Sequence, residues 1–314
     1  MGVVVGTWNL ENLYRPGGAF GPKTQAAYEA KLDTLAATIT VLAPDVLAVQ
    51  EVGQPEALDD LVARLPGPWT VTLSEHPDPR GIRVGFLTRT RPAAVAQVVD
   101  FPPLLRPIQD GDDPADTSAA MGRGGLHIRL DLAGAPWDLL TVHLKSKLLT
   151  FPGGRFAPTD EDQRVRFAAY ALYRRAAEAA TVRVAATAIL GGHGQDRPLV
   201  VLGDLNDTPQ AATTQLLYGP PGSQYGTGGF NQPDKGDASR LWNLAPQIPE
   251  GHRYTRIFEG QPELIDHILI SHALLTRLHT VDTHPNQVAS IGPNPSARRD
   301  IPASDHAPLI AHFT

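Results

Sequence analysis

The sequence predicts an α/β protein built as a four-layer α/β/β/α sandwich, with two mixed sheets packed face to face and helices outside. The chain has 314 residues, 42% of them hydrophobic, which is enough for a large core. A strand–helix–strand–helix–strands order is followed by a strand–helix–strand–strands order, which implies two similar halves with one sheet each. No linker separates the halves, so we expect a single domain over residues 1–314. A doubly wound parallel sheet is the alternative, but the run of strands between the helices fits it poorly.

In the first half, residues 26–42 predict an amphipathic helix, because apolar residues recur at spacings of 3, 4 and 3. Pro44 ends this helix. A shorter helix carries its apolar residues over 58–65 and closes at Pro66. Short apolar runs predict strands at residues 3–5, 45–50, 69–73, 83–88, 125–132 and 138–143.

The second half begins with a loop over residues 148–159 that contains two prolines and two glycines. A long helix is expected over 160–189, followed by a buried strand at 199–202. Residues 219–236 are rich in Gly, Pro and Gln and predict a long loop. The last strands are expected at residues 264–270 and 309–312.

Charge and cysteine usage exclude several classes of protein. The 27 Lys and Arg residues against 33 Asp and Glu give a net charge of −6, which argues against a tight, sequence-reading DNA-binding protein. A nuclease is still compatible, because it needs only a local basic rim. The absence of cysteine excludes thiol catalysis, thiolate zinc sites and disulfides.

No apolar run is long enough for a transmembrane helix, and the first residues lack the pattern of a secretory signal. The chain as given is therefore expected in the cytoplasm, while a leader removed from the native protein would allow secretion.

Short polar motifs stand at strand ends along the whole chain. They are Thr7-Trp8-Asn9, Gln50-Glu51, Thr141-Val142-His143, Gly203-Asp204-Leu205-Asn206, Ile265-Asp266-His267 and Ser304-Asp305-His306. Their oxygen and imidazole groups suit one hard divalent cation and one phosphate ester. Mg²⁺ keeps several waters, so one or two carboxylates suffice, and Mn²⁺ accepts the same oxygen-rich set.

Three residues are candidate metal ligands. Glu51 is the first choice because it follows a buried strand, and Asn9 offers a neutral amide oxygen to a metal or a phosphate. Asp305 is a candidate ligand for a second metal.

Four residues are candidates for proton transfer and charge stabilisation. Asp204 and Asn206 are two positions apart, so both side chains are expected on one face of an extended segment. The carboxylate can then deprotonate a water while the amide donates to a phosphate oxygen. Asp266 behind His306 would fix the imidazole tautomer and keep it protonated, ready to assist the phosphoryl oxygen or the leaving group.

The six motifs in this order resemble the endonuclease/exonuclease/phosphatase superfamily, of which deoxyribonuclease I is a familiar member. The resemblance runs from about residue 3 to residue 313 and implies a deoxyribonuclease I-like fold. It implies that Asp204 is the base with Asn206 as its partner. It also makes His143 similar to the second imidazole of the deoxyribonuclease branch, and it leaves open which histidine is the general acid.

The resemblance extends to a candidate phosphate-binding rim. Arg123 precedes a strand at a place where relatives carry a phosphate-contacting arginine. The stretch His-Leu-Lys-Ser-Lys that begins at His143 is similar to His-Phe-Lys-Ser-Lys of bacterial extracellular nucleases in the superfamily. Alternation would place Lys145 and Lys147 on one face with His143, although an ordinary charged strand end gives the same pattern. Asn12 is expected to line the same groove.

The leading hypothesis is a divalent-metal-dependent phosphodiesterase, a nuclease that hydrolyses DNA or RNA by in-line attack of water. A phosphatase or a phospholipid phosphodiesterase of the same fold is the first alternative, acting on phosphoinositides or sphingomyelin. A catalytically inactive binding module is the second, disfavoured because Glu51, Asp204 and His306 are all present. The expected partner is nucleic acid, and the expected state is a monomer without a stable protein partner.

Overall fold

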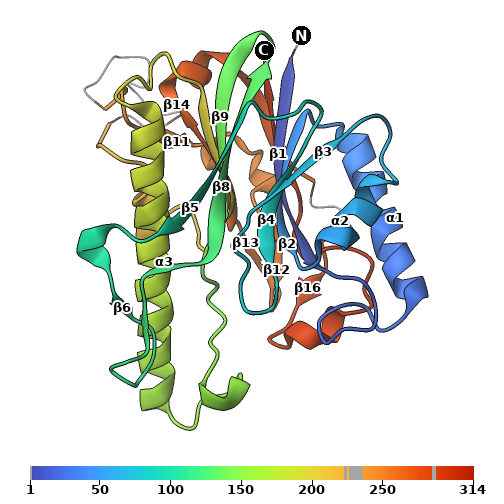
Figure 1. Ribbon diagram of the computed structural model, residues 1–314, viewed down its shortest axis with the longest axis vertical. Coiled ribbons are helices and arrows are strands. Elements are labelled where there is room, and N and C mark those ends of the chain that lie inside the picture. Colours follow the sequence, from blue (N-terminus) through green and yellow to red (C-terminus); the bar gives the residue numbers. More distant parts are fainter. Residues whose placement is uncertain (1, 223–224, 226–235, 285–287) are drawn as a thin grey trace.

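The computed structural model describes residues 2–222, 225, 236–284 and 288–314. Two six-stranded sheets lie between helices α1 and α2 on one side and helix α3 on the other (Figure 1). Both sheets are mixed, so the predicted four-layer sandwich is confirmed. Much of the loop predicted over residues 219–236 lies outside the described residues.

The first sheet has the strand order β15-β17-β1-β2-β4-β3. Strand β1 pairs in parallel with β2, and the other neighbours are antiparallel. The strands in this order are Leu278–Thr283, Leu309–Phe313, Val3–Leu13, Val46–Val52, Arg83–Thr88 and Thr70–Leu73.

The second sheet has the strand order β11-β14-β10-β9-β8-β5. Strands β9 and β10 are parallel and the remaining neighbours are antiparallel. With one parallel pair in each of the two large sheets, the doubly wound alternative is wrong. The strands in this order are Leu241–Asn243, Asp266–Ser271, Leu199–Asp204, Ala135–His143, Ala120–Leu132 and Ala94–Asp100.

Smaller elements border the sheets. The short strands β12, β13, β16, β6 and β7 span Arg256–Phe258, Gln261–Glu263, Ser290–Ile291, Ile108–Gln109 and Thr117–Ser118.

The α-helices α1 to α4 span Gln25–Leu42, Pro55–Val62, Glu161–Leu190 and Ala212–Gln215. Short 3₁₀ segments lie at Pro103–Leu105, Pro152–Gly154, Ala245–Gln247, Glu250–His252, His272–Arg277 and Pro295–Arg298.

The two long helices begin and end at residues that their sequences mark. The side chain of Thr24 accepts the N–H of Ala27 at the start of α1, and Asp160 accepts the N–H of Gln163 at the start of α3. Helix α3 ends at Gly191 in the left-handed conformation, which glycine adopts without steric cost.

The main core lies between the two sheets, where apolar side chains of both inner faces meet. Trp137 of β9 and Phe313 of β17 contact each other edge to face, with ring centroids 5.2 Å apart. Such side chains each contribute about 1.5–3 kcal/mol when fully buried. This packing fixes the relative position of the sheets, and therefore of the polar residues at their edges. Among the described residues, no helix is both long and apolar enough to cross a bilayer.

Candidate active site

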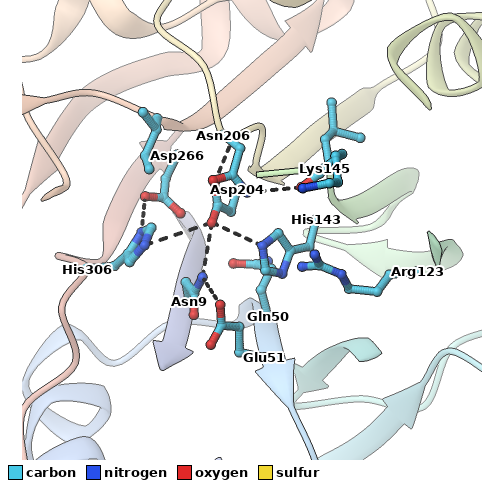
Figure 2. Close-up of polar contacts among 12 residues, drawn as sticks. Asn9, Gln50, Glu51, Arg123, His143, Lys145, Asp204, Asn206, Asp266 and His306 are labelled. Atoms are coloured by element: carbon cyan, nitrogen blue, oxygen red, sulfur yellow. Dashed lines mark hydrogen bonds and ion pairs between the residues drawn. The ribbon is translucent and has the colours of Figure 1, made fainter. Parts of the chain in front are cut away.

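Strand register brings the predicted residues together at one edge of the sandwich. On β10, Asp204 is paired with His143 of β9 on one side and with Asp266 of β14 on the other. On the opposite sheet, Asn9 of β1 is paired with Gln50 of β2, which precedes Glu51. Figure 2 shows these side chains converging around the Asp204 carboxylate, together with the His306 ring.

Gln50 links the two sheets directly beneath this cluster. Its side-chain amide donates to the hydroxyls of Thr7 on β1 and Thr141 on β9, at 3.1 Å in each case. All three side chains are buried. A fully satisfied polar contact between the sheets holds the residues above it at fixed separation.

The carboxylate of Asp204 lies at the centre of the cluster, only 1% exposed. Its Oδ2 accepts a hydrogen bond from Asn9 Nδ2 at 3.0 Å, and its Oδ1 accepts the N–H of Asn206 at 2.8 Å. The Nε2 atoms of His143 and His306 lie 3.4 and 3.9 Å from Oδ2. The carboxylate is therefore oriented from four sides.

The environment of Asp204 makes it a weaker acid than an ordinary aspartate. Burial, reinforced by the negative charge of Asp266, raises the pKa of Asp204 from 3.8 to about 7. A carboxylate with a pKa near the working pH is well matched to accept a proton from water.

His306 is held as an imidazolium. Its Nδ1 lies 2.6 Å from Asp266 Oδ2. Burial by itself would lower the pKa of His306, but the Asp266 carboxylate raises it to about 10. The backbone of His306 is also fixed, because its carbonyl accepts from Trp8 Nε1 and its N–H donates to Ser304 Oγ. The hydroxyl of Ser304 donates in turn to the carbonyl of Asn9.

His143 differs from His306 in charge. Burial, together with the positive charges of Arg123 and His306, lowers the pKa of His143 well below 6.5. Its Nδ1 is buried and has no hydrogen-bond partner among the described residues. The site therefore holds one neutral and one charged imidazole on opposite sides of Asp204.

One group of side chains has the spacing of a cation site. Asp204, Asp266 and His306 each offer a ligand atom, and these atoms lie within 4.8 Å of one another. A protonated imidazole carries hydrogen on both ring nitrogens and cannot coordinate a metal. With the pKa of His306 raised to about 10, this group is an ion-paired array in the neutral range.

The Glu51 carboxylate provides a second position for a cation, on the cleft surface. Its Oε2 accepts the N–H of Asn12 at 2.8 Å, and its Oε1 accepts from Asn9 Nδ2 at 3.3 Å. The oxygen of Asn9 is turned away, because it accepts the N–H of Glu11 at 3.0 Å. The Asn9 amide nitrogen bridges two carboxylates, and the expected contact of its oxygen with a metal or a phosphate stays a prediction.

Backbone strain is concentrated at this site. Seven described non-glycine residues have a positive φ, and four of them line the cleft: Glu11, Asn12, Glu51 and Asn206, with φ of 50°, 51°, 60° and 54°. Such conformations cost about 1–3 kcal/mol each and cluster at functional sites. Most of the described non-glycine residues with a positive φ therefore lie at the candidate active site.

Asn206 reaches the cleft by a different route from the one predicted. Its left-handed backbone ends the extended segment, so strict alternation with Asp204 does not apply. Its Nδ2 already donates to the carbonyl of Leu144 at 3.0 Å. In this structure Asn206 orients Asp204 through its backbone N–H, and the expected contact of its side-chain amide with a phosphate oxygen stays a prediction.

The alternation expected between His143 and Lys145 is not present, and the phosphate contact of Lys145 stays a prediction. Strand β9 ends at His143, so the alternation that would align Lys145 with it stops there. The ammonium of Lys145 turns back to the carbonyls of Ser146 and Leu148, at 3.1 and 2.9 Å. Lys147 does line the cleft, where its ammonium lies 3.2 Å from Asp207.

The cleft around these residues has a volume of about 510 Å³. Predicted residues on its wall include Asn12, Glu51, Arg123, Asp305 and His306. Arg123 lies within β8, and its buried guanidinium NH1 has no hydrogen-bond partner among the described residues. Six cationic side chains line the cleft: Arg80, Arg123, Lys147, Arg164, Arg256 and Arg298.

A buried ion pair beside the cleft was not predicted. Both carboxylate oxygens of Glu11 accept from the guanidinium of Arg298, at 2.7 and 3.0 Å, and Oε2 also accepts the N–H of Asp305. The two partners are 287 positions apart, so no local pattern reveals their contact. The pair fixes the loop that presents Asp305 and His306.

Comparison with known proteins agrees with this geometry. Residues 6–306 match the Endonuclease/Exonuclease/phosphatase family, whereas no curated protein sequence matches. The fold is similar to that of a mannosyl-6-phosphatase from Bacteroides thetaiotaomicron, with a TM-score of 0.60, 14% identity and 99% of each chain covered.

Two further solved structures share the fold. The human Nocturnin catalytic domain has a TM-score of 0.55 and 16% identity, covering 100% of this chain and 94% of its own. A truncated Caenorhabditis elegans TDP2 has a TM-score of 0.54 and 14% identity, covering 99% and 97%. At these identities the likeness shows the fold alone. With the family match spanning almost the whole sequence, the chain belongs to the endonuclease/exonuclease/phosphatase family of phosphoric ester hydrolases.

Proposed function

We propose that the protein is a divalent-metal-dependent phosphodiesterase, a nuclease that hydrolyses DNA or RNA. The observation that carries the proposal is the buried Asp204 carboxylate, whose pKa of about 7 suits a base, lying between a neutral and a charged imidazole. Cationic side chains around the cleft supply attraction for a polyanion, although the protein as a whole is negatively charged.

Each of these groups has a part in an in-line attack of water on phosphorus. Asp204 accepts the proton of the attacking water, held in place by Asn9 and the backbone N–H of Asn206. The imidazolium of His306 donates to a phosphoryl oxygen or protonates the leaving oxygen, while Asp266 keeps it oriented. No covalent enzyme intermediate is needed.

The donor groups on the cleft fit a hard divalent cation, Mg²⁺ or Mn²⁺. The Glu51 carboxylate would hold it, and Asp305, which also lines the cleft, is the candidate ligand for a second metal. A bound cation would withdraw charge from the phosphoryl oxygens in the transition state. One or two carboxylates are sufficient, because Mg²⁺ keeps most of its waters.

The shape and charge of the cleft support a diester substrate in a strand. Six Lys and Arg side chains line the cleft together with five acidic residues, so the described lining has a small excess of basic side chains. A strand that contacts several of these groups would bind with a steep salt dependence. His143, which is similar to the second imidazole of the deoxyribonuclease branch, favours a nuclease.

A phosphatase acting on monoesters is a second candidate, favoured by the similarity to the mannosyl-6-phosphatase structure. A phospholipid phosphodiesterase is the related possibility, favoured by the exposed apolar side chains of Leu148 and Phe156 at the cleft, 41% and 55% exposed. Both would use the same base and imidazolium.

The deciding experiment compares three substrate classes under one metal series. Supercoiled plasmid and single-stranded RNA, a panel of sugar phosphates, and vesicles containing phosphoinositide or sphingomyelin are each incubated with Mg²⁺ and with chelator. We expect metal-dependent nicking or strand cleavage at the highest specific activity. Release of inorganic phosphate from sugar phosphates, without strand cleavage, would replace the nuclease proposal by the phosphatase one.

Substitution of Glu51 by Gln tests the metal position. We expect the Mg²⁺ concentration for half-maximal activity to rise by about tenfold or more, because one charged oxygen ligand is lost. The control is Glu75→Gln on an exposed side chain, which should leave the Mg²⁺ requirement unchanged. An unchanged requirement in the Glu51 variant would move the cation elsewhere, and Asp266→Asn would then be titrated next.

A further inference from the structure

A second, smaller pocket adjoins the catalytic cleft. It has a volume of about 200 Å³ and shares Glu11, Asn12, Arg80, Phe156 and Arg298 with the cleft wall. A group bound in this pocket would therefore be a near neighbour of a group bound beside Asp204. None of the catalytic roles described above uses the pocket.

The distinctive residue of the pocket is Lys31 on helix α1. Its side chain is 3% exposed and lines the pocket, yet its ammonium makes no hydrogen bond or ion pair with the described residues. Burial lowers the pKa of Lys31, opposed by the nearby charges of Glu11 and Asp305. A buried ammonium is costly unless a partner satisfies it, so a ligand that accepts its hydrogens would be bound favourably.

Glu11, the acidic residue among the described lining residues of the pocket, already has other partners. Both oxygens of Glu11 are held by Arg298, and one of them also accepts the N–H of Asp305. The donors of Lys31 are thus not used by Glu11, which lies outside ion-pair distance of the ammonium. No described residue supplies an acceptor for the Lys31 ammonium, so a bound ligand can supply it.

The remaining walls favour an anion. Of the described lining residues, Lys31, Arg80, Arg298 and Arg299 are cationic and only Glu11 is acidic. Arg299 is anchored by the carbonyls of Gly18 and Gly21, each 2.8 Å away, so the loop that carries Phe20 is held against the pocket. The guanidinium of Arg80 lies 5.9 Å from the Phe20 ring centroid. The pocket is thus a preformed cavity lined by several positively charged side chains.

We propose that this pocket binds a second phosphate group of the substrate, the one in a linkage neighbouring the phosphodiester that is cleaved. The inference rests on the proposed function and adds a substrate feature to it. Lys31 supplies a point charge, and Arg80 and Arg298 supply planar donors at the boundary with the cleft. A free phosphate ion has the same chemistry, so the test separates the two sources.

The main test neutralises one phosphate at a time in a short oligonucleotide, using single methylphosphonate linkages on each side of a fixed cleavage site. For the wild type, one neighbouring neutral linkage should raise KM by about tenfold, the effect of one charge-assisted hydrogen bond. In Lys31→Met, KM on the all-phosphate strand should already be raised by about tenfold, with little further effect of that linkage. Lys23→Met is the matched control, since Lys23 is exposed and pairs with Asp300.

If Lys31→Met retains the full sensitivity of the wild type to every neutral linkage, the inference is overturned. A purely structural role for Lys31 would instead lower stability and slow all substrates equally, with the linkage sensitivity preserved. Arg80→Gln, at a partly exposed side chain, is measured alongside and should blunt the same linkage effect even if the Lys31 variant does not fold.

A second arm needs no turnover and separates this inference from the proposed function. With chelator present, inorganic pyrophosphate should raise the Tm of the wild type and Lys23→Met, but raise that of Lys31→Met or Arg80→Gln less. If no oligonucleotide is cleaved, the nuclease proposal fails, and the pyrophosphate measurement alone decides whether the pocket binds an anion. An equal rise in Tm in all variants would overturn the anion site. A Lys31-dependent Tm rise without any linkage effect on cleaved strands would show a site for free anions and would overturn the substrate assignment.

Discussion

Replacing Asp204 by Asn is expected to lower kcat by about 10²–10⁴-fold, the usual contribution of a positioned general base. Asparagine keeps the size of the side chain and an acceptor for the N–H of Asn206, but it cannot take a proton from water. Because the native carboxylate is buried and its pKa is raised to about 7, removing its charge should cost little stability beyond the hydrogen bond that Asn9 Nδ2 donates to Oδ2. The measurement is kcat on the best diester substrate, with Tm recorded in parallel.

The matched control is Asp59→Asn, which makes the same chemical change at an exposed position of helix α2. Its kcat should equal that of the wild type. A folded Asp204→Asn protein with more than about a tenth of wild-type kcat would contradict the assignment of Asp204 as the base, since even a modest general base contributes about a hundredfold. His143, at 3.4 Å from Asp204, would then be the next candidate.

The fold and the centre of the site were predictable because they depend on local patterns. A buried apolar strand that stops at a polar residue, as at Asp204, is readable from the chain itself. The strand register then brings the site together, since Asp204 is paired with His143 and Asp266 on the adjacent strands. The order of the motifs was enough to identify the family, and the sandwich follows from it.

Side-chain direction was not predictable, because it depends on neighbours that are distant in sequence. The Asn9 amide was expected to face a metal with its oxygen, but the N–H of Glu11 takes that oxygen and leaves the nitrogen for Asp204. Lys145 was expected on the face of His143, but the strand ends first and the ammonium turns to backbone carbonyls. In both cases the direction of the side chain depends on backbone groups that the local sequence pattern does not reveal.

Two peripheral strands lack the pattern that sequence reasoning requires. In β5, Ala94–Asp100, every side chain is exposed or half-buried, so no buried stripe marks the strand. In β15, only two of six residues are buried. Edge strands are defined by their partner more than by their own composition. For the same reason the contact of Glu11 with Arg298 was invisible until the fold brought them together.

Replacing Asp266 by Asn is expected to have the largest effect on stability. The carboxylate is fully buried and lies 2.6 Å from His306 Nδ1, so in the variant His306 either stays a buried imidazolium without its charge partner or gives up its proton. Breaking a buried ion pair in this way costs about 3–5 kcal/mol of unfolding free energy. We expect kcat to fall as well, because the imidazole loses its orientation and its proton. Urea unfolding at pH 6 measures the loss in unfolding free energy.

The pH dependence of stability provides an independent test of the same pair. The pKa of His306 is raised from 6.5 to about 10 in the folded protein, so the pair contributes fully below about pH 6.5. Its contribution is lost progressively as the pH rises through about 10, where the folded imidazolium loses its proton. In Asp266→Asn, burial without the carboxylate lowers the pKa of His306, so this alkaline loss of stability should disappear.

A matched control is available on the protein surface. Asp282 lies 2.8 Å from His252 Nδ1, in a pair whose side chains are 38% and 46% exposed. Asp282→Asn makes the same substitution in the same kind of pair, but solvent screens it, so the expected cost is about 0–1 kcal/mol. If the two variants lose equal stability, the Asp266–His306 pair is not the buried ion pair described here. A loss confined to Asp266→Asn, together with the missing alkaline transition, would establish that His306 carries its proton at neutral pH because of Asp266.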